Sequence, residues 1–362
     1  MRDPLATPLM QIDAEVVRRN LRRLVDYAAE YGLLIRPHTK THKSKHVAEM
    51  QLHEDSIGLT VAKVGEAEVM SQVGDDLLLA FPALDKARTK RLAQLALHKT
   101  VRVAIDSMEA ADALGAAARA TRGTIGILIE QDVGFHRTGV QTASAALRLA
   151  AHVDSAAGLR LDGLMCYPGH VWMPADQQEP ALQQISDLLH ATLVLWSDHG
   201  LEAGIVSGGS TPTAYQSHHI PELTEIRPGT YVYNDMNTVR GGYCTLDDCA
   251  VRLIATVVSN AVPGQVVIDA GSKTLTSDRC VPAPDAGFGY ITEYPQAVIT
   301  KLSEEHGQVD VTACPQPPKL GERVSIIPNH ICPCVNLQTA VWWQEAEGRS
   351  AEMVVDARGM LS

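Results

Sequence analysis

A basic run, RPHTKTHKSKH at residues 36–46, gathers amine and imidazole groups in a chain whose overall charge has the opposite sign. The run holds one arginine, three lysines and three histidines, whereas the 362-residue chain has a formal net charge of −11. Three kinds of chemistry fit such a run: a patch for an anionic polymer, a metal site, or one amine placed for covalent chemistry. The acidic balance argues against nucleic acid as a partner, because nucleic-acid binders usually carry a basic face.

The histidines of this run are not expected to hold a metal. His42 and His46 have the i,i+4 spacing of helical zinc ligands, but the glutamate that zinc proteases place directly after the first histidine is missing. We therefore interpret His38 and His42 as neighbours that position Lys40 or a phosphate. His46 is expected on a helix surface.

Other reactive side chains follow the ends of predicted strands. They are Lys63, Asp132, His136, Arg137, Tyr167, His170, Arg227, Tyr233 and Asp235, together with a Gly-Gly-Ser-Thr turn at 208–211. In an α/β barrel the carboxyl ends of the strands form the active-site face, so these groups are expected to share one face.

The Gly-Gly-Ser-Thr turn (Gly208, Gly209, Ser210, Thr211) offers small residues, backbone amides and hydroxyl groups. This combination suits a phosphate dianion, with an ordinary strand–helix turn as the alternative. Lysine, arginine, tyrosine and a phosphate cradle on one face suggest a phosphorylated aldehyde cofactor that a lysine amine holds.

A second constellation is His330-Ile331-Cys332. On an extended segment, residues i and i+2 point the same way, about 6.5 Å apart. An imidazole and a thiolate can then chelate one ion at about 2.0–2.3 Å and leave positions open for catalysis. From the residues alone, a buried His and Cys without a metal is the favoured interpretation. Cys334 is expected to point to the opposite face.

Alternating strand and helix patterns are expected to position the first group of residues. An amphipathic segment at 13–32 opens with a capping aspartate and closes at a glycine, which predicts a helix. Eight strand candidates follow at 33–38, 56–62, 76–82, 101–106, 125–132, 159–167, 203–209 and 224–233, with helical patterns in most of the gaps. This alternation predicts a (β/α)8 barrel, with a doubly wound open sheet as the alternative. No G-x-G-x-x-G follows the first strand, which weakens a dinucleotide-binding interpretation.

Strand-like segments without long helical patterns begin near residue 247 and predict a separate β-rich domain. We expect residues 1–14 to join this domain, residues 15–245 to form the barrel, and residues 246–362 to form the β-rich domain. Seven cysteines, an odd number spread over the chain, make a disulfide framework an unlikely design. No apolar run reaches signal-peptide or membrane-spanning length, so we expect a cytoplasmic protein with no membrane partner.

The motifs together resemble one family. R-P-H-x-K-T-H-K is similar to the cofactor-lysine signature of fold-type III pyridoxal-phosphate enzymes of the D-threonine aldolase and D-serine dehydratase group, which share a barrel with the alanine racemases. Further motifs occur in the expected order over nearly the whole chain: DVGFHRTG, YPGH, SGGSTPT, EIRPGTYVY, IDAGSK, EEHG and PNHICPCVNL.

The resemblance implies a role for individual residues. It makes Lys40 the Schiff-base lysine, places Arg137 against the phenolic oxygen of pyridoxal 5'-phosphate, and packs Tyr167 near the cofactor ring. It also implies cofactor contacts from His38 and from Arg227, the latter near the pyridine nitrogen. The phosphate contacts that it implies are Gly208, Gly209, Ser210, Thr211 and Tyr233. It assigns one divalent metal to His330 and Cys332, with zinc favoured by the thiolate and manganese or magnesium as alternatives.

Other lysines compete with Lys40 for the covalent role. Lys43 and Lys45 are expected at the start of the following helix, as solvated or phosphate-steering charges. Lys63 also follows a strand, and Lys273 lies in the β-rich domain.

The implied activity is that of a lyase acting on small D-3-hydroxy amino acids. Retro-aldol cleavage to glycine and an aldehyde, with His170 as the base, is the preferred reaction. Dehydration to a 2-oxo acid and ammonia, with Lys40 as the base at Cα, is the main alternative, and an amino-acid racemase or a noncatalytic pyridoxal-phosphate-binding protein are further ones. By analogy with the family we expect a homodimer whose active site is shared across the interface.

Overall fold

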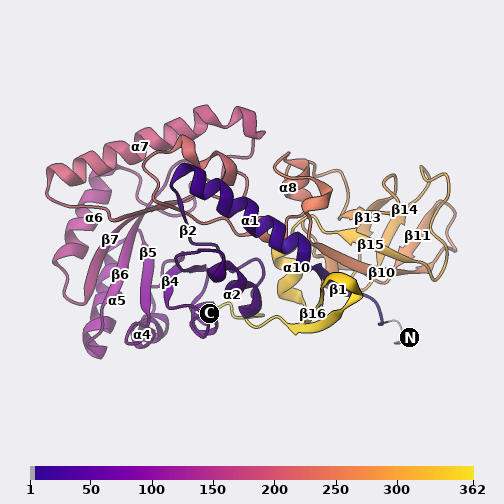
Figure 1. Cartoon of the computed structure of the whole chain (residues 1–362), viewed down its shortest axis with the longest axis horizontal. Coiled ribbons are helices and arrows are strands. Elements are labelled where there is room, and N and C mark those ends of the chain that lie inside the picture. Colours follow the sequence, from indigo (N-terminus) through magenta and orange to yellow (C-terminus); the bar gives the residue numbers. More distant parts are fainter. Residues whose placement is uncertain (1–4) are drawn as a thin grey trace. The chain divides into compact units, whose positions relative to one another are not determined.

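The computed structural model describes residues 5–362, which divide into two compact units (Figure 1). The β unit comprises the residues up to Leu21, Thr41–Lys43 and Thr230–Gly359. The barrel unit comprises Arg22–Lys40, Ser44–Gly229 and Met360–Ser362. Residues 1–4 of the expected N-terminal segment lie outside the described part of the chain. No described helix is both long and apolar enough to cross a membrane.

Eight parallel strands form the sheet of the barrel unit (Figure 1). They are β2 (Leu34–Ile35), β3 (Leu59–Val61), β4 (Asp76–Leu79), β5 (Thr100–Ile105), β6 (Ile125–Gln131), β7 (Leu159–Cys166), β8 (Ile205–Gly208) and β9 (Glu225–Ile226). Neighbouring strands pair in the order β2-β9-β8-β7-β6-β5-β4-β3. A parallel bridge between His38 and Thr60 joins the two ends of this order and closes the barrel. The predicted (β/α)8 fold is therefore confirmed.

Helices separate the strands, as the alternating pattern predicts. They are α1 (Ala14–Tyr31), α2 (Lys45–His53), α3 (Val64–Met70), α4 (Lys86–Leu95), α5 (Met108–Thr121), α6 (Ala143–Ser155), α7 (Glu179–Asp198) and the 3-10 helices η1 (Ala175–Gln177) and η2 (Ala214–His219). Asp13 caps α1 by accepting hydrogen bonds from the N–H groups of Glu15 and Val16. Gly32 ends it with a φ of +68°.

The predicted strand at 224–233 is wrong in its length. The strand β9 covers only Glu225–Ile226, and the chain then turns into a 3-10 helix, η3 (Thr230–Val232). Pro228 has no N–H to donate to a neighbouring strand, and Gly229 follows it, so the ladder stops at this point.

The barrel interior combines an apolar layer with a buried ionic layer. Leu78, Ala104, Leu128 and Met165, from β4 to β7, form one apolar cluster. In the ionic layer, the Nε of Arg36 lies 3.0 Å from both carboxylate oxygens of Glu225, and its Nη1 lies 2.5 Å from Oδ1 of Asp76. Arg36 is only 1 % exposed, so these ion pairs are shielded from water.

Glycines make room for this ionic layer. A side chain at Gly58 would place its Cβ 2.3 Å from Nη1 of Arg36. A Cβ at Gly126 would lie 2.3 Å from Oδ2 of Asp162, whose carboxylate pairs with Arg102. Both glycines are therefore required by the close approach of a buried charged group.

The β unit is built on a nine-stranded sheet, most of which is antiparallel. Its strands are β1 (Leu9–Asp13), β10 (Val251–Ser259), β11 (Gln265–Ile268), β12 (Tyr290–Ile291), β13 (Val298–Leu302), β14 (Gly307–Asp310), β15 (Arg323–Ile327), β16 (Ala340–Gln344) and β17 (Ser350–Val354). The first strand, β1, pairs with β10 and β16. Along β10, buried and half-exposed residues alternate, so one face of the sheet packs on the core. This confirms the predicted β-rich domain.

Short helices interrupt the strands of the β unit. They are α8 (Met236–Arg240), α9 (Ser272–Leu275), α10 (Ile331–Leu337) and the 3-10 helices η4 (Leu246–Asp248) and η5 (Ala346–Gly348). The predicted metal ligands of this unit, His330 and Cys332, lie at the start of α10.

Candidate active site

Lys40 lies on the loop after β2, and its side chain is half-buried. Its Nζ is 6.0 Å from the centroid of the Tyr167 ring, and its N–H lies 3.4 Å from Nδ1 of His38. His38 thus contacts the backbone of Lys40, as expected of a neighbour that positions it. Tyr167 directly follows β7, so two strand ends bring the amine and the aromatic ring together.

Two expectations for the rest of the basic run are wrong. Lys43 is only 4 % exposed and has a left-handed backbone with a φ of 50°, so it is not a solvated charge. The helix α2 begins at Lys45 with Ser44 as its N-cap, so Lys43, unlike Lys45, does not lie at the start of this helix. Residues 36–39 and 41–44 are buried because they pack into the interior as a loop, whereas Lys45 is half-buried and His46 is exposed.

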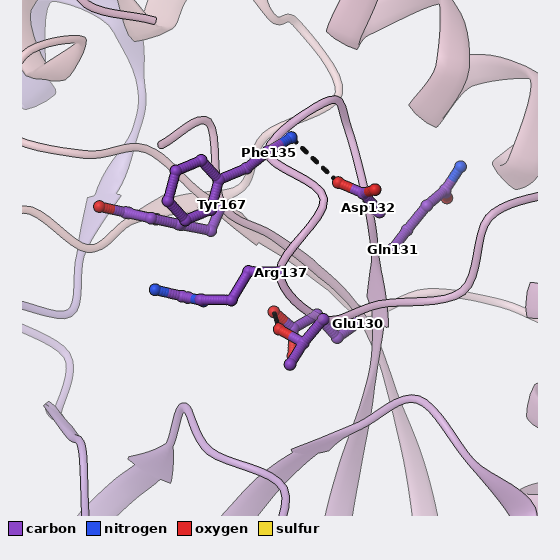
Figure 2. A pocket seen from close by; sticks show the side chains of 7 residues that line it. Glu130, Gln131, Asp132, Phe135, Arg137 and Tyr167 are labelled. Carbon is purple, nitrogen blue, oxygen red and sulfur yellow. Dashed lines mark hydrogen bonds between the residues drawn. The ribbon is translucent and has the colours of Figure 1, made fainter. Parts of the chain in front are cut away.

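Arg137 shares the Tyr167 ring with Lys40. Its guanidinium carbon lies 4.7 Å from the ring centroid, within the range of a cation–π contact. Figure 2 shows Arg137 and Tyr167 next to each other in a pocket. The other residues that line this pocket are Glu130, Gln131, Asp132, Phe135 and Thr138. The amine, the guanidinium and the aromatic face therefore meet in one place, as the sequence predicts.

Asp132 organises the loop that carries Arg137. Its Oδ1 accepts hydrogen bonds from the N–H groups of Gly134, Phe135 and His136 at 3.0–3.1 Å, and its Oδ2 lies 2.6 Å from Nδ1 of His136. Burial opposes ionisation of this carboxyl, but the bonds from His136 and Gly134 outweigh it and lower its pKa to about 2. Asp132 is therefore a charged anchor of the loop.

His170 lies against the same loop. A Cβ at Gly134, which has a φ of +118°, would lie 3.0 Å from both Cε1 and Nε2 of His170. Burial lowers the pKa of His170, with His136 acting in the same direction and Asp132 against it. A neutral imidazole can accept a proton, so His170 is able to act as a base.

The predicted phosphate turn lies between β8 and η2. Gly209 has a φ of +80°, and a Cβ at Gly208 would lie 2.6 Å from Leu223 Cδ2, so glycine is needed at both positions. Ser210 is buried, and its N–H donates to Oγ1 of Thr213 at 3.1 Å. Small residues and buried hydroxyl groups at this turn fit a phosphate group.

Arg227, after β9, is buried and fixed by two hydrogen bonds. Its Nη1 donates to Oγ of Ser207 at 2.7 Å, and its Nη2 donates to the carbonyl oxygen of Cys166 at 2.8 Å. Burial lowers the pKa of Arg227. The structure therefore places this arginine at the ends of β7 and β8, inside the barrel unit.

Glu130 was not predicted, although the sequence carried a signal for it. It is the one charged residue in the apolar strand IGILIEQ, and its side chain is 4 % exposed. Its Oε1 accepts a hydrogen bond from Oγ1 of Thr138 at 2.8 Å, and the charges of Arg137 and Arg227 act on it. Burial nevertheless raises the pKa of Glu130.

The second centre, in the β unit, pairs His330 with Cys332. The expectation of an extended segment is wrong: His330 is the N-cap of α10, and Cys332 lies in the first helical turn. The two side chains still interact. Burial opposes protonation of His330, but the hydrogen bond and charge of Cys332, aided by Asp235 and Asp278, raise its pKa to about 9. Cys334 points elsewhere, and its Sγ donates to the carbonyl oxygen of Leu275.

Two aspartates hold this pair: Asp278, which was not predicted, and Asp235, which was expected on the active-site face of the barrel but lies in the β unit. Nδ1 of His330 lies 2.8 Å from Oδ2 of Asp278, which leaves the other ring nitrogen for a ligand. Asp235 is fully buried, caps α8, and accepts a hydrogen bond from the N–H of Ile331 at 3.0 Å. On the thiol side, Sγ of Cys332 lies 3.2 Å from Oγ1 of Thr41.

The donor set fits a metal that needs few protein ligands. An imidazole and a thiol suit zinc, and a carboxylate on the far ring nitrogen is the usual support of a ligating histidine. Among residues 5–362 no group of three or more potential ligands gathers, so solvent or substrate would complete the coordination.

Tyr233, predicted to help bind phosphate, is buried in the same unit, edge-on to His42.

Comparison with known proteins identifies relatives over the whole chain. Residues 12–237 match the alanine racemase N-terminal domain, and residues 250–342 match a putative serine dehydratase domain. The D-threo-3-hydroxyaspartate dehydratase of Delftia sp. (strain HT23) is 31 % identical over 352 residues, which cover 91 % of each chain.

Solved structures agree with these relatives. The D-threonine aldolase of Filomicrobium marinum superposes with a TM-score of 0.90 at 30 % identity, and covers 99 % of this chain and 97 % of its own. A cysteine-to-alanine mutant of a D-threo-3-hydroxyaspartate dehydratase, described as the metal-free form, gives a TM-score of 0.86 at 28 % identity and covers 97 % of both chains.

Proposed function

This chain belongs to the family of fold-type III pyridoxal-phosphate lyases that includes D-threonine aldolases and D-serine dehydratases, and we propose that it cleaves D-3-hydroxy amino acids to glycine and an aldehyde. The observation that carries this proposal is the meeting of Lys40 and Arg137 at the Tyr167 ring. An amine and a guanidinium that share one aromatic face suit a flat, anionic, aldehyde-bearing cofactor.

Residues of the barrel unit would hold the cofactor. Lys40 is the amine for its aldehyde, and Tyr167 offers an aromatic face. The turn at Gly209, Ser210 and Thr211 offers small residues and hydroxyl groups for its phosphate. When bound, pyridoxal phosphate supplies an electron sink for the negative charge left on the α-carbon after the bond to the β-carbon breaks.

Residues of the β unit would hold the metal. His330 and Cys332 are the ligands, and Asp278 fixes the orientation of the imidazole through Nδ1. The thiolate favours zinc over manganese or magnesium. When bound, the cation supplies Lewis acidity at the 3-hydroxyl of the substrate.

His170 is the proposed base for cleavage. Because its pKa is lowered, His170 is mostly neutral near pH 7. A ring nitrogen can then take the proton of the 3-hydroxyl as the Cα–Cβ bond breaks. Gly134 leaves space for the ring and so fixes where this nitrogen lies.

Dehydration is the second candidate, and Cys332 favours it. A cysteine at the second ligand position resembles the dehydratases of the family, and the 31 % identical relative from Delftia carries that activity in its name. In this reaction Lys40 would remove the Cα proton, and the products would be a 2-oxo acid and ammonia.

Incubation of the purified protein with D-threonine, pyridoxal phosphate and zinc separates the two reactions. We expect glycine and acetaldehyde, measured by mass spectrometry and by coupled reduction of the aldehyde. Formation of 2-oxobutyrate and ammonia would contradict the aldolase assignment and show that the protein is a dehydratase. Conversion of D-threonine to L-allo-threonine, by inversion at Cα without other products, would indicate a racemase.

Borohydride reduction followed by peptide mapping tests the cofactor lysine. We expect the pyridoxyl group on Lys40. Lys63 is the matched control, because it also follows a strand and burial lowers its pKa, yet its Nζ lies 3.5 Å above the Phe81 ring. The variant Lys40→Arg should lose the label while Lys63→Arg keeps it; a label on Lys63, or on no lysine, would overturn the assignment.

A further inference from the structure

The end of β6 carries a carboxyl group in a place where a charge is costly. Glu130 is the sixth residue of β6 (Ile125–Gln131), every residue of which is buried. An isolated carboxylate at such a position loses its hydration and needs compensating partners. The other side chains of this strand are apolar or amides, and Glu130 also lines the pocket. This position suggests that its carboxyl group has a role in the pocket.

Two hydrogen bonds join Glu130 to the segment that follows Arg137. Oγ1 of Thr138 donates to Oε1 of Glu130 at 2.8 Å, and the N–H of Val140 donates to the Glu130 carbonyl oxygen at 2.9 Å. Thr138 is the next residue after Arg137, so one end of the arginine backbone is tied to the strand. Gly139 permits this close approach: a Cβ there would lie 2.5 Å from the backbone nitrogen of Asp132.

The other carboxylate oxygen of Glu130 has a different environment. Among residues 5–362, Oε2 accepts no hydrogen bond. The positive charges of Arg137 and Arg227 favour the ionised carboxylate, and the negative charge of Asp106 opposes it. Figure 2 shows Glu130 and Arg137 on the same pocket as Tyr167. Glu130 is thus an acidic group on which the charges of the buried Arg227 and of the exposed Arg137 both act, and both arginines are expected to face one cofactor.

We propose that Glu130 is a positioning residue of the cofactor pocket, which orients Arg137 through the Thr138 hydrogen bond and balances the charge of Arg137 and Arg227. This inference rests on the proposed function, because it assigns Glu130 to the pyridoxal-phosphate site. Glu130 itself touches no substrate. Without its carboxylate, the Arg137 segment loses its side-chain tie to β6, and the charges of Arg137 and Arg227 lose an acidic group on which both act.

The variant Glu130→Gln tests this role, because it keeps the size and the acceptor for Thr138 but removes the charge. We expect the dissociation constant for pyridoxal phosphate, measured by fluorescence titration of the apoprotein, to rise about tenfold. The absorption maximum of the bound cofactor should shift, and kcat should fall more than KM rises. Thr138→Val, which keeps the charge and removes the tie, should weaken binding in the same direction with a smaller spectral shift.

Glu66→Gln is the matched control, because Glu66 is an equally buried glutamate of the barrel unit whose Oε2 accepts from the N–H of Ala62 outside this pocket. It should leave cofactor affinity and spectrum unchanged. If Glu130→Gln binds pyridoxal phosphate with the wild-type constant and spectrum, the positioning role is wrong and the proposed function stands. If the wild-type protein binds no pyridoxal phosphate at all, the proposed function itself fails.

Discussion

The two candidate centres are built in opposite ways. In the barrel unit, the proposed cofactor residues come from separate strand ends: Lys40 follows β2, Arg137 follows β6, Tyr167 follows β7 and Arg227 follows β9. In the β unit, both proposed metal ligands come from one turn at the start of α10, and two aspartates hold that turn. The first centre therefore depends on the register of a whole barrel, and the second on a few local hydrogen bonds.

This difference predicts where mutations act. A destabilising change in the barrel interior should displace the residues at several strand ends together, because the parallel strands are hydrogen-bonded to one another in one sheet. A change around His330 should alter metal binding and leave the fold largely intact. Three substitutions, in Arg36, Asp132 and Asp278, test this comparison.

The largest effect is expected from Arg36→Ala. The substitution leaves the buried carboxylate of Glu225 without its cationic partner, which costs about 3–5 kcal/mol for a buried pair, whereas Asp76 keeps its pair with Arg102. Urea unfolding followed by circular dichroism measures the loss in free energy of unfolding. Arg91→Ala is the matched control, because its pair with Glu68 is partly exposed and should cost about 0–1 kcal/mol. Equal costs for the two variants would contradict a barrel that depends on its ionic layer.

Much of the barrel could be predicted because its strands are short apolar runs between helical patterns. All eight strands occur where the sequence places them, and the residues at their ends include Lys40, Arg137 and Tyr167. The length of the strand predicted at 224–233 is the exception. This segment contains Pro228, which is a signal against a continuing strand that strand propensity alone does not capture.

The metal turn could be predicted by its residues but not by its conformation. Pro333 lies in the first turn of α10, where proline is tolerated, so it is a sequence signal for a helix start that the extended interpretation of HIC does not use. Asp278 and Asp235 lie 52 and about 95 positions away from their partners in the chain, so no local spacing could reveal them. Burial of Lys43 likewise follows from tertiary packing and has no signal in a run of basic residues.

The next effect concerns acid stability of the loop at the barrel site. Folding lowers the pKa of Asp132 from an ordinary 3.8 to about 2, so its carboxylate stabilises the protein at pH values above about 4, and this contribution is lost as the pH falls toward 2. The shift corresponds to about 2 kcal/mol. Wild type and Asp132→Asn should therefore differ most in free energy of unfolding near pH 6 and converge near pH 2.

The measurement is a series of urea unfolding curves between pH 2 and 6 for both proteins. A constant difference across this range would show that Asp132 acts by shape and packing and not by its charge. Activity at pH 7 gives a second readout, because Asp132 also holds the loop against which His170 lies.

The smallest effect on the fold is expected from Asp278→Asn in the β unit. Asp278 and His330 are each partly exposed, so the free energy of unfolding of the metal-free protein should change by less than about 1 kcal/mol. Metal affinity should fall about tenfold, because the amide is a weaker partner for the Nδ1–H and no longer enforces the ligating orientation of the imidazole. Competition with a zinc chelator measures this constant directly.

His330→Ala and Cys332→Ala set the scale for this prediction, since each removes a proposed ligand and should abolish detectable zinc binding in the same assay. A variant Asp278→Asn with wild-type zinc affinity would show that the Asp278–His330 contact is no support for the metal. A variant that loses several kcal/mol of stability together with its zinc would show that the turn at α10 is as deeply coupled to the fold as the barrel strands are. Loss of zinc affinity at unchanged stability is the result that separates a centre built from one turn from a centre built from many strands.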